Sequence, residues 1–249
     1  MENLRISTIT SVMNVSSPID LKAIYDGIPI SEYIPFIEYG ANNVPRGFSK
    51  KALKKKRKKK VKKIFFNQAT LHVVHDGKIM NVKLFNNGNV QITGLKKVDQ
   101  GKKLVTKLID YLIYFDIFSE ADVIIRDEKL VLINSDFDVG MEIDREKLHR
   151  AIIEQGIYSS YEPCIYPGVN IKYFINTNNW DGICCCDEEL RCNGKGRADG
   201  NGNCKKITIA VFKSGKIIIT GGQNTDQLET AYYFITEFID EHKDLVKLT

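Results

Sequence analysis

Five of the six cysteines lie within 21 residues of one another, and four of them have a spacing that could bind a metal ion. These four are Cys184, Cys186, Cys192 and Cys204, in the pattern C-x-C-x5-C-x11-C. Four thiolates form a common tetrahedral ligand set for structural zinc. The spacing differs from the usual pair of C-x2-C motifs, so free thiols on a flexible loop and redox chemistry are the alternatives. We expect no required cofactor apart from a structural zinc ion that these residues could hold.

A second cluster of chemically similar residues is the basic segment 50–63, KKALKKKRKKKVKK. It holds 11 basic residues and no acidic one, and because the whole chain has a net charge of +5, the remainder carries −6. A run of like charge cannot pack, and it is typical of a solvated loop or a localisation signal. It could also tether the protein to phosphates with a salt-sensitive affinity. The run is compatible with nucleic-acid binding but does not establish it.

The common catalytic fingerprints are missing from the sequence. It has no P-loop, no H-E-x-x-H, no G-x-S-x-G and no dinucleotide-binding glycine motif. The four histidines are scattered, and we interpret His72 and His75 as ordinary strand residues. No stretch approaches the roughly 18 apolar residues of a membrane span, and the N-terminus lacks the apolar core of a signal peptide. We expect an intracellular, soluble protein that is not an enzyme and has no membrane partner.

The elements that must position these groups occur in two copies. Residues 82–94, VKLFNNGNVQITG, return 127 positions later as residues 209–221, IAVFKSGKIIITG. Upstream, Ile19-Asp20 matches Ile143-Asp144 at an offset of 124. A tandem duplication of this kind predicts a molecule with pseudo-two-fold symmetry. We expect two repeats: residues 1–117, with a basic insertion at 46–63, and residues 118–249, with a Cys-rich insertion at 177–205.

Hydrophobic periodicity and turn signals predict the same elements in each repeat: a strand, a helix, three strands in hairpins and a long helix. Asp76-Gly77 and Asn87-Gly88 indicate hairpins, Asp127-Glu128 indicates a further turn, and segment 27–45 is interpreted as a short helix and loops. The expected strands lie at roughly 4–15, 64–94, 121–139, 169–176 and 206–220, and the expected helices lie near 20 and at 100–115, 145–155 and 227–242. This order predicts an α+β fold with an antiparallel sheet and helices on one side.

Alternation along the strands separates a core face from a more polar face. The core face should hold Ile207, Ile209 and Val211 in one repeat, and Val82 and Leu84 in the other. The opposite face should hold Thr208, Ala210 and Phe212, and in the other repeat Asn81, Lys83 and Phe85. An aromatic at the end of a small, polar face could be core or edge packing. Its recurrence in both repeats favours a contact surface, and a broad face with apolar tips suits the minor groove of DNA.

Segments of both repeats resemble the TATA-box-binding protein family. The resemblance is carried by SSYEPCIYPGV (159–169) and AVFKSGKIIITGG (210–222), and more weakly by VKLFNNGNVQITGLK (82–96). It covers nearly the whole chain apart from the two insertions. It implies a saddle-shaped, curved antiparallel sheet built from two pseudo-symmetric repeats, with helices on the convex side. The Lys-, Asn- and Ile-rich composition with long insertions is similar to that of relatives from large nucleocytoplasmic DNA viruses.

The resemblance implies a role for particular residues. The intercalating pair of repeat two would be Tyr166 and Phe212, and that of repeat one would be Phe85 with Phe66 or Phe65. Thr93, Thr220 and Ile218 would lie in the minor groove, and Lys96, Lys172 and Lys216 would face phosphates. Glu162 lies where the family contacts transcription factor IIB. Asn89 and Gln91 replace a family lysine and an apolar groove residue, so repeat two is expected to hold DNA more firmly than repeat one.

The function that the resemblance implies is that of a general transcription initiation factor. It would bind and bend AT-rich promoter DNA and recruit a transcription factor IIB-like factor and a multisubunit RNA polymerase. It would act in the nucleus or, for a viral protein, in a cytoplasmic virus factory or the virion. One alternative is a protein-interaction module with little TATA specificity that contacts DNA mainly through the basic run. A second is an accessory domain of a nuclease or glycosylase, for which no catalytic domain is left over.

Overall fold

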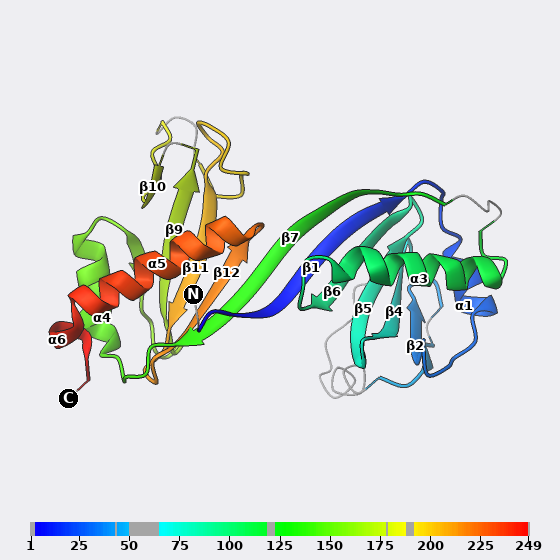
Figure 1. Cartoon of the computed structure of the whole chain (residues 1–249), viewed down its shortest axis with the longest axis horizontal. Coiled ribbons are helices and arrows are strands. Elements are labelled where there is room, and N and C mark those ends of the chain that lie inside the picture. Colours follow the sequence, from blue (N-terminus) through cyan, green and yellow to red (C-terminus); the bar gives the residue numbers. More distant parts are fainter. Residues whose placement is uncertain are drawn as a thin grey trace. The chain divides into compact units, whose positions relative to one another are not determined.

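The computed structural model describes residues 3–42, 44–49, 65–118, 123–177, 179–187 and 192–248. The basic run 50–63 lies outside these residues. The chain divides into an N-terminal unit, Thr8–Val131, and a C-terminal unit that combines Leu132–Thr249 with Met1–Ser7. Each unit contains an antiparallel sheet with helices packed against it (Figure 1). No helix in the described part of the chain has the length and apolar character needed to cross a membrane.

The sheet of the N-terminal unit has the strand order β1-β6-β5-β4-β2-β3. The hairpin between β4 and β5 has positive φ angles at Asp76 (50°) and Gly77 (69°), as a two-residue type I′ turn requires. The predicted hairpin is therefore present. The strands are β1 (Arg5–Val15), β2 (Phe36–Tyr39), β3 (Arg46–Gly47), β4 (Gln68–His75), β5 (Lys78–Phe85) and β6 (Asn89–Leu95).

Two helices pack against this sheet. α1 (Leu21–Gly27) contacts β2 and β4, and α3 (Gln100–Tyr114) contacts β6. Asp20 begins α1, because its carboxylate accepts hydrogen bonds from two amides of the first turn, both at 2.9 Å. α3 buries one stripe at helical spacing, as predicted: Gly101, Leu104, Val105, Leu108, Ile109 and Leu112.

The sheet of the C-terminal unit has the order β10-β9-β11-β12-β7, with β8 also paired to β9. The hairpin between β11 and β12 contains Gly215, whose φ is 80° and whose Cβ would clash with the carbonyl oxygen of Met141. The strands are β7 (Ile125–Asp138), β8 (Tyr158–Ser160), β9 (Val169–Asn176), β10 (Asn179–Gly182), β11 (Lys205–Val211) and β12 (Lys216–Gly222).

Three helices complete the C-terminal unit. α4 (Arg145–Glu154) contacts β8 and β9, α5 (Thr225–Glu241) contacts β11 and β12, and α6 (Lys243–Val246) contacts α4 and α5. Asp144 caps α4 as Asp20 caps α1, so two residues that match at an offset of 124 have the same structural role. The two repeats thus share the way in which their first helix begins, as well as the sequence match.

Burial confirms the predicted alternation along the strands. Ile207, Ile209 and Val211 are fully buried, and so are Val82 and Leu84. Cross-strand neighbours extend the same face, since Ile209 is paired with Ile171 on one side and with Ile219 on the other. Each such branched side chain stabilises its unit by about 1.5–3 kcal/mol relative to exposure. The helices therefore cover one face of each sheet and leave the other to its polar residues.

Two details of the predicted secondary structure are wrong. β7 runs without a break through Asp127-Glu128, where the sequence indicates a turn. An Asp gives only a weak turn signal when no Gly, Asn or Pro stands beside it, and segment 125–131, IRDEKLV, has none of these. Segment 27–45 also contains β2, which pairs with β4, in place of helix and loops only. Four residues are too few for a clear strand periodicity.

Candidate nucleic-acid interface

The face of the C-terminal sheet opposite the core is built from small and polar side chains. Cross-strand register arranges them in rows across β9, β11, β12 and β7. Most are only partly buried, and Ile218 is 37% exposed. We call this surface the C-terminal open face. Its two rows are Lys172, Thr208, Thr220 and Asn134, and then Asn170, Ala210, Ile218 and Asp136.

Hydrogen bonds between side chains fix the first row. The Nζ of Lys172 donates to the Oγ1 of Thr208 at 3.0 Å, and the Thr220 hydroxyl donates to the Oδ1 of Asn134. Burial, with a smaller contribution from Lys206, lowers the pKa of Lys172. Lys172 therefore lies along the sheet surface. It offers a donor at the level of the face, whereas the resemblance implies a contact with a phosphate.

The aromatic pair predicted for repeat two comes together at one end of this face. The ring centroids of Tyr166 and Phe212 lie 5.8 Å apart in an edge-to-face arrangement, with 60° between the ring planes. Tyr166 is 38% exposed. Gly168 packs against both rings, since a Cβ there would lie 3.0 Å from Tyr166 and 3.2 Å from Phe212. The absence of a side chain at Gly168 thus allows the two rings to meet.

The N-terminal sheet has an equivalent surface, which we call the N-terminal open face. The hydroxyls of Thr10 and Thr93 lie 3.2 Å apart, as a counterpart of the Asn134–Thr220 contact. Gln91 stands where the repeat has Ile218 in the other unit, so an amide replaces an apolar side chain. The rows of this face are Val12, Gln91, Lys83 and Thr70, and then Thr10, Thr93, Asn81 and His72.

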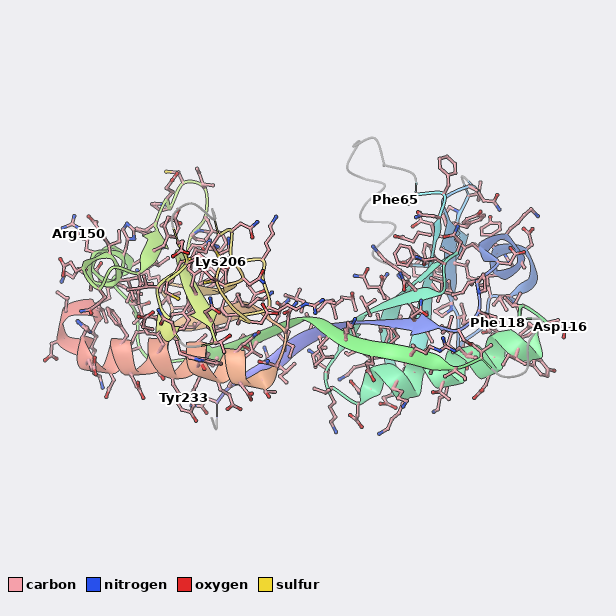
Figure 2. All side chains as sticks on the ribbon, turned by 90° about the horizontal axis from the view of Figure 1, so that it is seen from above. Phe65, Asp116, Phe118, Arg150, Lys206 and Tyr233 are labelled. Carbon is pink, nitrogen blue, oxygen red and sulfur yellow. The ribbon has the colours of Figure 1, made fainter. Side chains whose placement is uncertain are left out.

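Strand register distinguishes between Phe65 and Phe66 as the partner of Phe85. Phe85 lies opposite Gln68 in β4, and Phe66 precedes Gln68 by two residues. Val211 lies opposite Val169 in β9, so the same register places Phe212 opposite Gly168. Tyr166 precedes Gly168 by two residues, as Phe66 precedes Gln68. Phe66 is 68% exposed, and Phe65, labelled in Figure 2, is 56% exposed. The register therefore assigns Phe66 as the counterpart of Tyr166.

The two other lysines implied by the resemblance are exposed. Lys216 begins β12, and it lines a surface depression together with Phe212 and Ile218. Lys96 follows β6, where its backbone amide donates to the Oε1 of Gln100 at 2.8 Å. That bond fixes the chain between β6 and α3. Exposed cations beside the open faces are suited to phosphate contacts, which position a protein on DNA without reading its sequence.

Acidic residues of β7 also lie on the C-terminal open face, and the sequence reasoning missed them. Asp136 lies opposite Ile218, and Asp138 lies opposite Lys216. The Nη2 and Nε of Arg5 donate to the Oδ2 of Asp136 at 2.6 and 3.1 Å. A carboxylate here would repel phosphates, and the ion pair engages the Arg5 guanidinium. The signal was the alternation of Asp136 and Asp138 around the buried Phe137.

Substituting Asp136→Asn is expected to strengthen duplex binding by a factor of about three to ten at low salt. The change removes one negative charge and releases Arg5, which adds about one phosphate contact and steepens the salt dependence. Fluorescence anisotropy over a salt series measures both quantities. Asp240→Asn, on α5 of the same unit, makes the same charge change away from the open face. Equal effects of the two substitutions would show that Asp136 has no local role.

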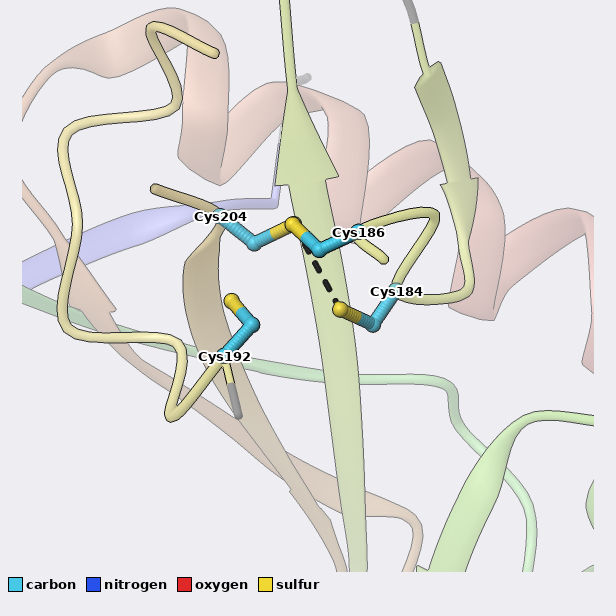
Figure 3. A group of neighbouring side chains, drawn as sticks. All are labelled: Cys184, Cys186, Cys192 and Cys204. Carbon is cyan, nitrogen blue, oxygen red and sulfur yellow. Dashed lines mark hydrogen bonds between the residues drawn. The ribbon is translucent and has the colours of Figure 1, made fainter. Parts of the chain in front are cut away.

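The four predicted zinc ligands converge (Figure 3). The sulfur atoms of Cys184, Cys186, Cys192 and Cys204 all lie within 4.8 Å of one another. Cys204 is buried, which raises the pKa of its thiol. The other two cysteines, Cys164 and Cys185, are exposed.

Glu162, the predicted partner contact, is also exposed, and its backbone carbonyl accepts a hydrogen bond from the amide of Tyr166 at 2.9 Å.

The fold of the chain is similar to a solved structure. Each α+β unit has an antiparallel sheet, helices on its core face and an open polar face. The chain resembles the solved structure of the TATA-box-binding protein (TBP) of Methanococcus jannaschii with a TM-score of 0.58 and 17% identity. The match covers 96% of this chain and 99% of that one. The predicted TBP-like α+β fold is confirmed.

Sequence comparison finds proteins of the same kind. Residues 129–242 match the family model described as transcription factor TFIID (or TATA-binding protein, TBP). The TATA-box-binding protein-like protein of Acanthamoeba polyphaga mimivirus is 28% identical over 274 aligned residues, covering 99% of this chain and 67% of the relative. TATA-box-binding protein 2 of Haloferax volcanii is 27% identical over 160 residues, covering 63% of this chain and 66% of the relative. The chain thus spans about two thirds of the length of both relatives, and the predicted resemblance to the TBP family is confirmed.

Proposed function

We propose that this TBP-like chain is a transcription initiation factor that binds promoter DNA through the minor groove and bends it. The observation that carries the proposal is the C-terminal open face, which ends in the partly exposed pair Tyr166 and Phe212. The register gives the N-terminal open face the equivalent residues Phe66 and Phe85. Sequence relatives and fold support the same function.

The chemistry of the open faces fits the floor of an AT-rich minor groove. A·T pairs present only acceptors there, and the hydroxyls of Thr208 and Thr220 can donate to acceptors. Ala210 is small and 4% exposed, and its neighbour Ile218 is 37% exposed, so this row offers a low apolar surface for close van der Waals approach. Aromatic side chains at the end of such a face can enter a base step and kink the duplex, a behaviour for which TBP is itself a standard example.

Phosphate contacts would supply much of the affinity. Lys216 and Lys96 are exposed beside the open faces, and the basic run 50–63 adds 11 cations to the chain. Each neutralised phosphate releases counterions, so affinity should fall steeply with salt. Shape and deformability of the duplex would then set sequence preference, because the minor groove carries little base-specific information.

Recruitment would use the exposed segment around Glu162. Its backbone carbonyl begins the turn that carries Tyr166, and the guanidinium of Arg145 stacks over the neighbouring ring of Tyr161 at 5.2 Å. A factor bound at Glu162 would therefore lie next to the kinked base step. We propose a transcription factor IIB-like partner and a multisubunit RNA polymerase, acting in the nucleus or in a viral factory. The protein would catalyse no reaction.

Polar and charged residues on the two open faces favour a second candidate function. Gln91 and Lys83 occupy the N-terminal open face, and Asp136 occupies the other. Gln91 and Lys83 weaken the fit to the groove floor, and the Asp136 carboxylate weakens the fit to phosphates. A TBP-like interaction module with little TATA specificity would then contact DNA mainly through the basic run.

Replacing residues 50–63 by an uncharged linker of equal length separates the two candidates. An AT-rich duplex with donor and acceptor dyes at its ends is titrated with both proteins over a salt series. The proposed function predicts that the replacement weakens binding by about tenfold or more, because phosphate contacts are lost. At saturating protein, the DNA ends should still approach each other. A duplex that stays straight with the unaltered chain, and loses all affinity with the replacement, would establish the second candidate.

A further inference from the structure

We propose that Cys184, Cys186, Cys192 and Cys204 form a tetrathiolate site for one Zn²⁺ ion, which fastens the insertion between β9 and β11 to the sheet. Cys184 and Cys186 follow β10, whereas Cys204 immediately precedes β11. The ligands therefore come from both ends of the insertion. This site is independent of the open faces and of the proposed DNA binding.

The sulfur atoms lie close to the spacing that zinc requires. A tetrahedral site with Zn–S bonds of about 2.3 Å places its sulfurs about 3.8 Å apart. The Sγ of Cys204 lies 3.7 Å from that of Cys184 and 3.2 Å from that of Cys186, and all four sulfurs lie within 4.8 Å of one another. A disulfide joins two sulfurs at about 2.05 Å and leaves the other two unexplained. Convergence of four thiols on one point favours a metal ion, and zinc is the common ion for such a set.

Nitrogen donors surround the sulfur cluster, as a bound thiolate set requires. The buried Asn176 directs its Nδ2 at the Sγ of Cys204 (3.3 Å) and, more distantly, at the Sγ of Cys186 (3.9 Å). The backbone amide of Gly202 donates to the Sγ of Cys186 at 3.1 Å. Four thiolates around a divalent ion leave an excess of negative charge, which such donors stabilise while they fix the orientation of the ligands.

Asn176 also ties the insertion to the end of β9. Its side chain donates to the carbonyl of Gly200 at 2.8 Å and accepts from the amide of the same residue at 3.0 Å. The hydroxyl of Tyr173, in the same strand, donates to the carbonyl of Trp180. The side chain of Asn176 thus links β9, the loop at Gly200 and the sulfur cluster.

The composition of the insertion explains why it needs a metal ion. Residues 177–204 are rich in Gly, Asn and charged side chains, so they can bury little apolar surface of their own. Small segments of this kind are commonly stabilised by a structural metal ion, whose binding energy becomes folding energy. The site lies at the opposite end of β9 and β11 from Tyr166 and Phe212, about 20 Å away at the rise of a strand. Loss of zinc should therefore loosen the insertion without removing the aromatic pair.

Elemental analysis of the purified full chain, kept in reductant, tests the site. We expect one zinc ion per chain, and less than about a tenth of that in Cys192→Ser and in Cys204→Ser, because three remaining thiolates bind far more weakly. Cys185→Ser is the matched control, since Cys185 lies between two ligands but outside the cluster, and it should keep its zinc. Cys192 is only half-buried, so its substitution should leave a folded chain even where loss of the buried Cys204 does not.

Cobalt and proteolysis supply readouts that do not depend on DNA. Co²⁺ added to the chelator-treated chain should give the visible absorption of a tetrahedral thiolate complex, and Zn²⁺ should abolish it. Chelation should also make residues 179–187 and 192–204 more sensitive to protease, while cleavage within the described ranges outside the insertion stays unchanged. A metal-free chain that takes up neither ion, or equal zinc loss in Cys185→Ser and Cys192→Ser, would overturn the proposal. Iron in place of zinc would overturn the choice of ion.

Discussion

Substituting Phe212→Ala is expected to abolish most of the DNA bend and to weaken duplex binding by about tenfold or more. Stacking of an aromatic side chain on a base contributes about 1–3 kcal/mol, and the substitution removes that contact. It also leaves Tyr166 without the ring 5.8 Å away that holds it in place. Without this wedge, the kinked state loses the contact that stabilises it. Energy transfer between dyes at the duplex ends reports the bend, and anisotropy reports the affinity.

Two further substitutions calibrate that result. Tyr233→Ala removes an exposed aromatic from α5 in the same unit (Figure 2) and should change neither bend nor affinity. Phe85→Ala should have a smaller effect than Phe212→Ala, because Gln91 and Lys83 make the N-terminal open face more polar than the face with Ile218. An unchanged bend in Phe212→Ala would exclude the aromatic pair from DNA contact. A larger effect of Phe85→Ala than of Phe212→Ala would contradict the prediction that the C-terminal unit holds DNA more firmly than the N-terminal unit.

Much of the fold could be predicted because it is encoded locally. The Ile and Val alternation in β11 identified the core face, and the Asp76-Gly77 pair identified a hairpin by its need for positive φ. The failures were also local in origin. The continuous strand through Asp127-Glu128 depends on pairing, which residue polarity does not report. β2 is a short strand that forms because β4 lies beside it.

Residues of the candidate site could be named where the sequence resembles a known family. Tyr166 and Phe212 were paired by resemblance, and the structure brings them together. The choice between Phe65 and Phe66 needed strand register, because two adjacent phenylalanines are equivalent in a sequence pattern. The ion pair between Arg5 and Asp136 joins residues 131 positions apart, so no local pattern shows it.

The cysteine cluster shows a similar division. Its four members were named from spacing, and the structure adds their convergence. Asn176, which donates toward two of the sulfurs, was not foreseen, because an asparagine at the end of a strand resembles an ordinary turn residue. Supporting contacts of this kind depend on which loops meet in space.

Exchange of two or three base pairs within an AT-rich site should weaken binding more than the loss of Phe212. Replacing A·T by G·C adds an amino group to the floor of the minor groove, which would meet Ala210 and Ile218 on the C-terminal open face. Each unfavourable base pair costs about 1–3 kcal/mol, so two or three should weaken binding by about a hundredfold or more. Inosine·cytosine pairs keep the minor groove of A·T but present the major groove of G·C.

Comparing the affinity of the chain for these three duplexes tests the central claim, that the open faces contact the minor groove. The account predicts nearly equal affinity for the A·T and inosine·cytosine duplexes, and much weaker binding to the G·C duplex. Equal binding to all three would show that the basic run, and not the open faces, holds the DNA. Weak binding to both the inosine·cytosine and the G·C duplex would indicate contact in the major groove and would contradict the account.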